Sequence, residues 1–248
     1  MSWFWTVPMN KQLKQFESRK LFFSEYLYKL VLRNELNIIF RSELQKKEKL
    51  SYARQELDRL AEDYRNNLPL QKKAWRADIH LDKNDYFDAM AIYNALKKSD
   101  EYKIRIDPYS SISLFSNNRA FLLDLSSKLK TDTLEFWEPN SDYIELLKTK
   151  TKIQIVDEQP ELPLKVWFNS TRINKDFANW LRANSDKCKI GTIALEGLEN
   201  YGYLNGLYIY LRDEKILNLV TLLAGSSIRS VEKLVYKGDI DKYKYGSE

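Results

Sequence analysis

"YKIRIDPYSSISLF", residues 102–115, is the stretch that decides the fold. Residues 102–106 alternate as a strand, Asp107-Pro108 begins a turn, and residues 112–115 are typical of the returning strand. This hairpin lies between two segments with helical periodicity. Their apolar positions are Tyr86, Ala89, Met90, Tyr93 and Leu96 before the hairpin, and Phe121, Leu122, Leu125 and Leu129 after it.

Two further strands flank these helices, at residues 76–81 and 133–137. Asp82 or Asn84 can cap the first helix, and Asn117 can cap the second. The order is therefore β-α-β-β-α-β, which is typical of a ferredoxin-like or RRM-like split sandwich. We expect an α+β protein in which residues 75–140 form such a ferredoxin-like lobe.

The segment before this lobe, residues 1–74, is predicted to be an N-terminal strand followed by a long helix. Residues 25–33 alternate and are rich in strand formers, although a helical stripe also fits them. From Ser42 to Asn66 an amphipathic helix is indicated more clearly. Its stripe consists of Leu50, Ala53, Leu57, Leu60, Ala61 and Tyr64 among charged residues.

A second α/β lobe is predicted over residues 150–248, and it can be built on the same kind of split sheet. Four strands and three helices are indicated. The strands are residues 151–156, 164–168, 204–212 and 231–236, and the helices are residues 176–184, 192–199 and 213–225. The sequence identity between the two lobes is too slight to indicate a repeat.

Composition excludes several classes of protein. The chain has 248 residues, 44% of them apolar, which is enough for a sizeable core. One cysteine, Cys188, and one histidine, His80, exclude an intramolecular disulfide, a cysteine-based zinc site and a His–His metal pair. No segment has the length and apolarity of a membrane span, so we expect a cytosolic chain without a membrane partner.

Sequence motifs for catalysis are also missing. Neither a nucleophile elbow nor a phosphate-binding glycine loop occurs. We therefore expect no catalytic residue, no cofactor and no metal. An alternative is a metal-dependent nuclease or nucleotidyl transferase, with Mg²⁺ bound by carboxylates at strand ends. Its candidate ligands are Asp78, Asp82, Asp85 and Asp107, which also fit ordinary roles as helix caps and turn formers.

The strand "LNGLYIYLR", residues 204–212, indicates a nucleic-acid-binding surface. Tyr208, Tyr210 and Arg212 share one face of this strand, opposite an apolar face. RRM-like sheets stack bases on such aromatic residues, beside basic residues that meet phosphates. In the first lobe the matching candidates are Lys103, Arg105 and Phe115. The alternative is ordinary sheet surface. The net charge of +5 permits nucleic-acid binding without demanding it.

The N-terminal tip is a candidate protein-interaction segment. Trp3, Phe4 and Trp5 either form a docking arm or fold into the chain's own core. The first reading favours a different class of function, a virion structural protein or a binder of a host protein. The sequence leaves the oligomeric state open.

Several stretches resemble uncharacterised bacteriophage-encoded proteins. They are "YKIRIDPYSSISLFSNN", "LEFWEPN", "LYIYLRDEKILNLVTLLAG" and "KLVYKGDIDKYKYG". The resemblance implies a viral context, in the cytoplasm of a bacterial host cell or in the virion, and it carries no catalytic residues over. The leading expectation is a non-enzymatic phage accessory protein that binds single-stranded nucleic acid, with a protein partner as the alternative.

Overall fold

The computed structural model describes residues 12–41, 46–73, 78–99, 101–107 and 109–245, which form a mixed α+β protein. The chain divides into two compact units. The first unit contains the described residues through Ser18 together with Glu25–Pro139, and the second contains Arg19–Ser24 together with the chain from Asn140 onward. Each unit is built on its own five-stranded sheet.

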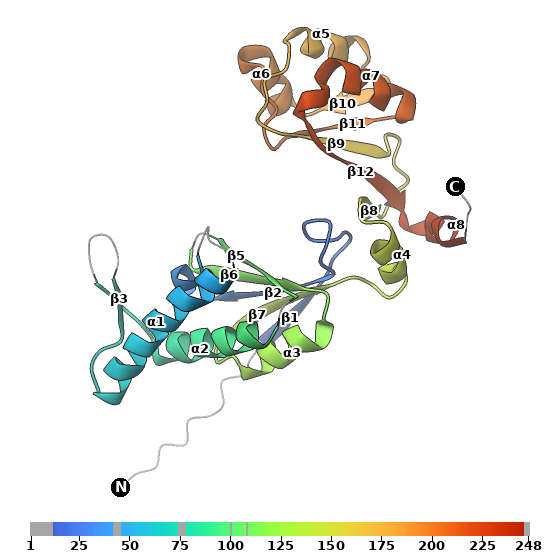
Figure 1. Ribbon diagram of the computed structural model, residues 1–248. Helices are drawn as coiled ribbons and strands as arrows, with labels where there is room; N and C mark the ends of the chain where they lie inside the picture. Colours follow the sequence, from blue (N-terminus) through green and yellow to red (C-terminus); the bar gives the residue numbers. More distant parts are fainter. Residues whose placement is uncertain (1–11, 42–45, 74–77, 100, 108, 246–248) are drawn as a thin grey trace. The chain divides into compact units, whose positions relative to one another are not determined.

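The first unit is a sheet with helices on one face (Figure 1). Its strand order is β1-β7-β2-β6-β5, with β1 parallel to β7 and every other neighbouring pair antiparallel. The strands are β1 (Gln12–Glu17), β2 (Tyr28–Arg33), β5 (Lys103–Asp107), β6 (Ser111–Ser116) and β7 (Thr133–Glu138). The covering helices are α1 (Lys46–Arg65), α2 (Lys83–Lys98) and α3 (Arg119–Lys128).

Alternation along β2 determines which side of this sheet is buried. Leu30 and Leu32 are buried, whereas Lys29 lies on the opposite face of the strand.

Side-chain caps begin the helices, as expected for their sequences. Asp82 caps α2, but α3 is capped by Asn118 rather than by the predicted Asn117. Asn117 instead accepts a hydrogen bond from the backbone N–H of Leu27.

In the part that the structure describes, the strand predicted at residues 76–81, the first of the predicted lobe, does not join the five-stranded sheet. Strand β4 (Asp78–His80) pairs with β3 (Gln71–Lys73) in a separate two-stranded ladder, and all three residues of β4 are exposed. Its place in the main sheet is taken by β2, whose alternate apolar residues can be buried against helices. The 3₁₀ helix η1 (Asn37–Phe40) follows β2. Apart from Arg19–Ser24, the described part of residues 12–73 belongs to the same unit as residues 78–139.

The second unit has a sheet with the order β10-β11-β9-β12-β8. Strand β8 is parallel to β12, and the other neighbouring pairs are antiparallel. The strands are β8 (Ile153–Val156), β9 (Leu164–Phe168), β10 (Cys188–Ile190), β11 (Tyr208–Leu211) and β12 (Ile228–Tyr236). Helices α5 (Asp176–Ala183), α6 (Thr192–Tyr201) and α7 (Glu214–Ala224) cover one face. The short elements are α4 (Ile144–Thr149), η2 (Gly225–Ser227), η3 (Lys237–Asp239) and α8 (Ile240–Tyr245).

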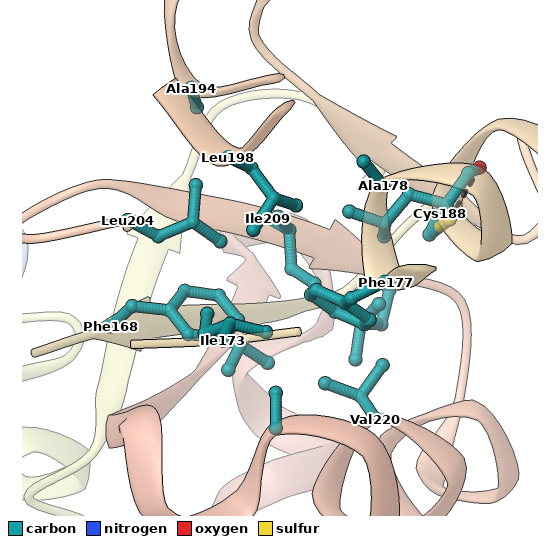
Figure 2. Close-up of a cluster of buried hydrophobic side chains, with 14 of the residues drawn as sticks. Phe168, Ile173, Phe177, Ala178, Cys188, Ala194, Leu198, Leu204, Ile209 and Val220 are labelled. Carbon is teal, nitrogen blue, oxygen red and sulfur yellow. Dashed lines mark hydrogen bonds between the residues drawn. The ribbon is translucent and has the colours of Figure 1, made fainter. Parts of the chain in front are cut away.

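The core of the second unit lies between this sheet and its helices (Figure 2). Phe168 from β9 and Ile209 from β11 point into it, and both are fully buried. Phe177 from α5 packs against Phe168, with 6.3 Å between the ring centroids. Because side chains alternate along a strand, the residues between these core positions must lie on the face without helices.

The two sheets share one strand order, although β5 and β6 are joined by a short turn whereas α6 lies between β10 and β11. In each, the second strand along the chain is central. The fourth strand pairs with one side of this central strand, and the third strand forms the sheet edge beyond it. The fifth strand pairs with the other side of the central strand. In each, an additional first strand pairs in parallel with that last strand. β1, β2, β5, β6 and β7 therefore correspond to β8, β9, β10, β11 and β12.

Candidate nucleic-acid interface

The two tyrosines of β11 lie on the face of the second sheet that the helices do not cover. Ile209 and Leu211 are fully buried in the core, so Tyr208 and Tyr210 project to the other side. The Tyr208 side chain is 36% exposed, and Tyr210 is half-buried. Their ring centroids are 5.3 Å apart at an interplanar angle of 72°.

A third aromatic ring, which sequence reasoning missed, joins this pair. Trp167 of β9 stands directly opposite Tyr208 in the strand register. Their ring centroids are 4.7 Å apart in an edge-on arrangement with an interplanar angle of 61°. The indole Nε1 of Trp167 is buried and has no hydrogen-bond partner among the described residues. Alternation in the predicted strand 164–168 places Trp167 on the outward face, and that signal could have identified it.

Lys165 lies among these three rings. Its Nζ is 3.9 Å from the ring centroid of Tyr208, 4.5 Å from that of Trp167 and 5.7 Å from that of Tyr210. Only 8% of the residue is exposed. Burial, followed by the nearby positive charge of Lys20, lowers the pKa of Lys165 below its ordinary value of 10.5. We call Lys165, Trp167, Tyr208 and Tyr210 the aromatic face.

Charged residues surround the aromatic face. Lys20 donates to both carboxylate oxygens of Glu232 at 3.2 Å, and its Nζ lies 5.6 Å from the Trp167 ring. Glu232 stands opposite Lys165 in the register. On the other side, exposed Lys189 of β10 stands opposite Tyr210. The carboxylate of Glu232 is thus already neutralised by a cation, whereas Lys189 extends the basic character toward the sheet edge.

A cavity of about 240 Å³ borders the two tyrosines. Its lining is largely apolar and includes Ile190, Ile193 and Leu207, together with Tyr208 and Tyr210. Its volume is below the roughly 300–1,000 Å³ of sites for drug-sized ligands. A cavity of this size and character suits a flat ring better than a large ligand.

Arg212, the third predicted residue of β11's face, lies just beyond the strand. Its guanidinium donates to the carbonyl of Asp186, and its backbone N–H donates to the carbonyl of Lys187 at 3.0 Å. It lines a different cavity of about 860 Å³, together with Arg182 and Lys189. Arg212 is therefore held beside the turn before β10, with its charge near that edge of the sheet.

The predicted residues of the first unit lie together on the helix-free face of their sheet. Lys103 stands opposite Phe115 in the register, and Arg105 stands opposite Ser113. Arg105 forms an ion pair with Asp107 at 2.8 Å. Phe115, however, is only 1% exposed, so its ring presents no free surface to a base. Tyr26 contributes to this burial, with ring centroids 6.4 Å apart.

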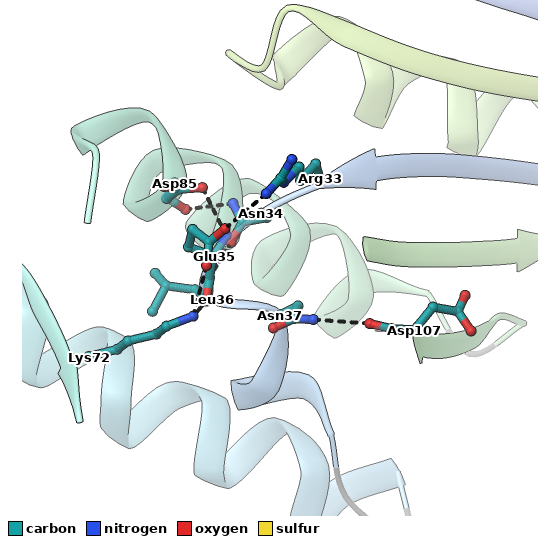
Figure 3. A network of polar contacts seen from close by, with 8 residues as sticks. All are labelled: Arg33, Asn34, Glu35, Leu36, Asn37, Lys72, Asp85 and Asp107. Atoms are coloured by element: carbon teal, nitrogen blue, oxygen red, sulfur yellow. Dashed lines mark hydrogen bonds and ion pairs between the residues drawn. The ribbon is translucent and has the colours of Figure 1, made fainter. Parts of the chain in front are cut away.

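Three of the four carboxylates considered as magnesium ligands have partners within the fold, and the fourth, Asp78, is an exposed residue of β4. Asp82 caps α2, and Asp107 binds Arg105 and Ser113. Figure 3 shows Asp85 accepting from the backbone N–H of Glu35 at 3.0 Å, while Lys72 pairs with the Glu35 side chain. Burial raises the pKa of Asp85. In the described parts of the chain, no three His, Cys, Asp or Glu side chains gather closely enough to hold a metal ion.

The lone cysteine lies in the second unit, and the lone histidine lies in the first. Cys188 is buried in the core of the second unit, and its thiol donates to the carbonyl of Asn184 at 3.1 Å. Burial raises the pKa of Cys188 to about 11, which suppresses the nucleophilic thiolate. His80 is an exposed residue of β4 in the first unit.

The candidate interaction tip, Trp3, Phe4 and Trp5, lies outside the described residues. Among the helices that the structure describes, none combines the length and the apolar character of a membrane span.

A scan against protein-family models finds no match. The curated proteins and the solved structures likewise give no match. The candidate function therefore rests on the aromatic face itself.

Proposed function

We propose that this protein binds single-stranded nucleic acid through the aromatic face of its second unit. The observation that carries the proposal is the cluster of Trp167, Tyr208 and Tyr210 around Lys165, on the side of the sheet opposite the helices. Aromatic rings bordered by cations are the combination that single strands need, because bases stack on the rings while phosphates meet the charges. A duplex hides its base faces and would gain only the second of these contacts.

The connectivity of the second unit supports the proposal. Strands β9, β10, β11 and β12 have the sheet order expected of a ferredoxin-like split sandwich, with β9 and β11 in its centre, although α6 is an additional helix between β10 and β11. RRM-like sheets stack two or three bases on aromatic residues of their strands. The three rings lie on these two central strands, although the sequence lacks the consensus motif of that family.

Lys165 has two roles in the proposed mechanism. In the free protein, its ammonium group lies against the rings, where cation–π attraction offsets part of its desolvation. A phosphate group would attract this cation outward and leave ring surface for a base. The buried Nε1–H of Trp167, which has no partner in the described structure, would then gain access to a nucleic-acid oxygen.

Fluorescence anisotropy with labelled single-stranded RNA, single-stranded DNA and duplex DNA tests this function. The variant is Tyr208→Ala with Tyr210→Ala, which removes two rings. The matched control is Tyr201→Ala, because Tyr201 is an exposed tyrosine at the end of α6 and away from the sheet face. Tighter binding of single strands by the wild-type protein and by the control, but not by the double variant, supports the proposal.

A specific observation also favours a second function, binding of a protein partner. Leu219, Leu222 and Leu223 of α7 are exposed, Leu222 by 83%, at the i, i+3, i+4 spacing of a helical stripe that flanks the buried Ile216 and Val220. Such an apolar stripe is a feature of docking helices. Light scattering of Leu222→Glu, with the exposed loop residue Leu68→Glu as control, tests it. An oligomer lost only in the α7 variant supports self-association.

A further inference from the structure

Lys29 and Lys165 occupy the same position in the two sheets. Lys29 of β2 stands opposite Phe115 of β6 and Trp137 of β7. Lys165 of β9 stands opposite Tyr210 of β11 and Glu232 of β12. Because β2 corresponds to β9, and β6 to β11, both lysines lie at the centre of the helix-free face of their sheet.

The correspondence extends along a row of residues across the strands. Lys103 of β5 stands opposite Phe115, as Lys189 of β10 stands opposite Tyr210. Each sheet therefore has a lysine, an aromatic residue and a second lysine on three consecutive strands. The residues of the first row are Lys103, Phe115 and Lys29, and those of the second are Lys189, Tyr210 and Lys165.

The accessible rings of the first sheet lie on the other side of the central lysine. Phe115 is buried, but Trp137 of β7 is half-buried and Phe16 of β1 is 36% exposed. These two rings are stacked, with centroids 4.7 Å apart and an interplanar angle of 18°. The Nζ of Lys29 lies 5.3 Å from the Trp137 centroid. The first sheet thus also places a half-buried lysine beside accessible aromatic surface.

The charge of this face suits an anionic ligand. Lys14, Lys29, Lys103 and Arg105 lie on it, whereas its acidic residues are Glu135 and Asp107. Both carboxylates are engaged: Glu135 accepts from Nε1 of Trp137 at 3.2 Å, and Asp107 pairs with Arg105. Burial, followed by the charge of Arg105, lowers the pKa of Lys29. Arg105 thus lies close enough to repel Lys29, although Glu135 and Asp107 attract it, and a phosphate would relieve that repulsion.

We infer that Phe16, Trp137 and Lys29 form a second stacking site for single-stranded nucleic acid, so that one chain binds two segments of a strand. This inference rests on the proposed function of the aromatic face. Bases would stack on the exposed side of the Phe16–Trp137 pair, and Lys29 and Lys103 would meet the phosphates. The site differs from the predicted one around Phe115, whose ring is covered.

The number of oligonucleotides bound by the full chain tests the second site. Native mass spectrometry with an oligothymidylate of about 4–6 nucleotides, the lower range of one single-strand site, reads this number directly. We expect two oligonucleotides per wild-type chain. Trp137→Leu, which keeps apolar volume but removes the stacking ring, should leave one. Trp137→Phe should retain two, and Tyr208→Ala with Tyr210→Ala should leave one.

The possible failures are distinguishable. One oligonucleotide per wild-type chain, lost in the double tyrosine variant and retained in Trp137→Leu, overturns the second site and leaves the proposed function intact. Binding that neither variant reduces, or no binding at all, overturns both. If Trp137→Leu does not fold, photo-cross-linking of the wild-type chain decides: cross-links to Phe16 or Trp137 support the second site, and cross-links confined to the second unit overturn it.

Discussion

The ammonium group of Lys165 lies 3.9 Å from the ring centroid of Tyr208, in a position where the residue is only 8% exposed. A buried cation is normally paired with a carboxylate. Here the carboxylate opposite Lys165, that of Glu232, forms an ion pair with Lys20. The rings of the aromatic face therefore surround the ammonium group of Lys165, which the charge of Glu232 also attracts, and an incoming phosphate would be favoured there.

The stability of the protein should therefore depend on the protonation of Lys165. Because its pKa is lowered in the folded state, the folded chain binds this proton less tightly than the unfolded chain does. The charged form destabilises the fold at neutral pH, and stability is regained as pH rises through the lowered pKa toward 10.5. Lys165→Met should be more stable than wild type at pH 7. The difference in melting temperature should shrink on approaching pH 10.5. A pH-independent difference would contradict this account of Lys165.

The salt dependence of binding should reveal phosphate contacts by Lys189. This residue is exposed beside Tyr210, where it can reach the backbone of a stacked strand. For a single strand, each phosphate contact contributes about 0.7 to the slope of log affinity against log salt. Lys189→Gln should reduce that slope by about 0.7. Lys175→Gln, an exposed lysine before α5 that donates to a backbone carbonyl, serves as the control and should leave the slope unchanged.

Asp88 should be a key stabilising residue of the first unit. It is 1% exposed on α2 and accepts hydrogen bonds from the backbone N–H groups of Lys130 and Thr131, the latter at 2.9 Å. Asp88→Ala leaves both donors without this partner and should lower the free energy of unfolding by about 1–3 kcal/mol. Urea denaturation measures the loss. Asp88→Asn keeps one acceptor and should lose less; an alanine variant as stable as wild type would be incompatible with this role.

Divalent metal ions should not stabilise the protein. Asp82 and Asp107 are already used by the α2 cap and by Arg105, so a cation would have to break existing contacts to bind them. Thermal unfolding with and without Mg²⁺ or Mn²⁺ should give the same midpoint. A clear upward shift of the unfolding midpoint that Asp107→Asn abolishes would support the alternative function, a metal-dependent nuclease or nucleotidyl transferase.

Local sequence patterns predicted which face of the sheet a side chain lies on better than they predicted which strands pair with each other. The outward positions of Tyr208 and Tyr210 follow from alternation within β11, and β9 has the bounds that its sequence indicates. The pairing of Trp167 with Tyr208 depends on register between distant segments, which alternation does not encode. The insertion of β2 between β6 and β7 was missed for the same reason.

Burial on the sheet face was equally hard to predict from a single strand. Phe115 alternates correctly for an outward position, but Tyr26 packs near its ring. Strand β10 is only three residues long, too short for a period-2 pattern to stand out, although the strand order shared by the two sheets includes it. A short edge strand can complete a topology while leaving almost no signal in the sequence.

The central claim is that single strands bind by stacking on the aromatic face, and anisotropy at physiological salt tests it most directly. Wild type and Tyr201→Ala should bind a labelled single strand more tightly than duplex DNA. Tyr208→Ala with Tyr210→Ala should weaken single-strand binding by about 1–3 kcal/mol for each stacked base that is lost. Equal affinity of the double variant and wild type for the single strand, or binding that occurs only at low salt, would contradict the claim.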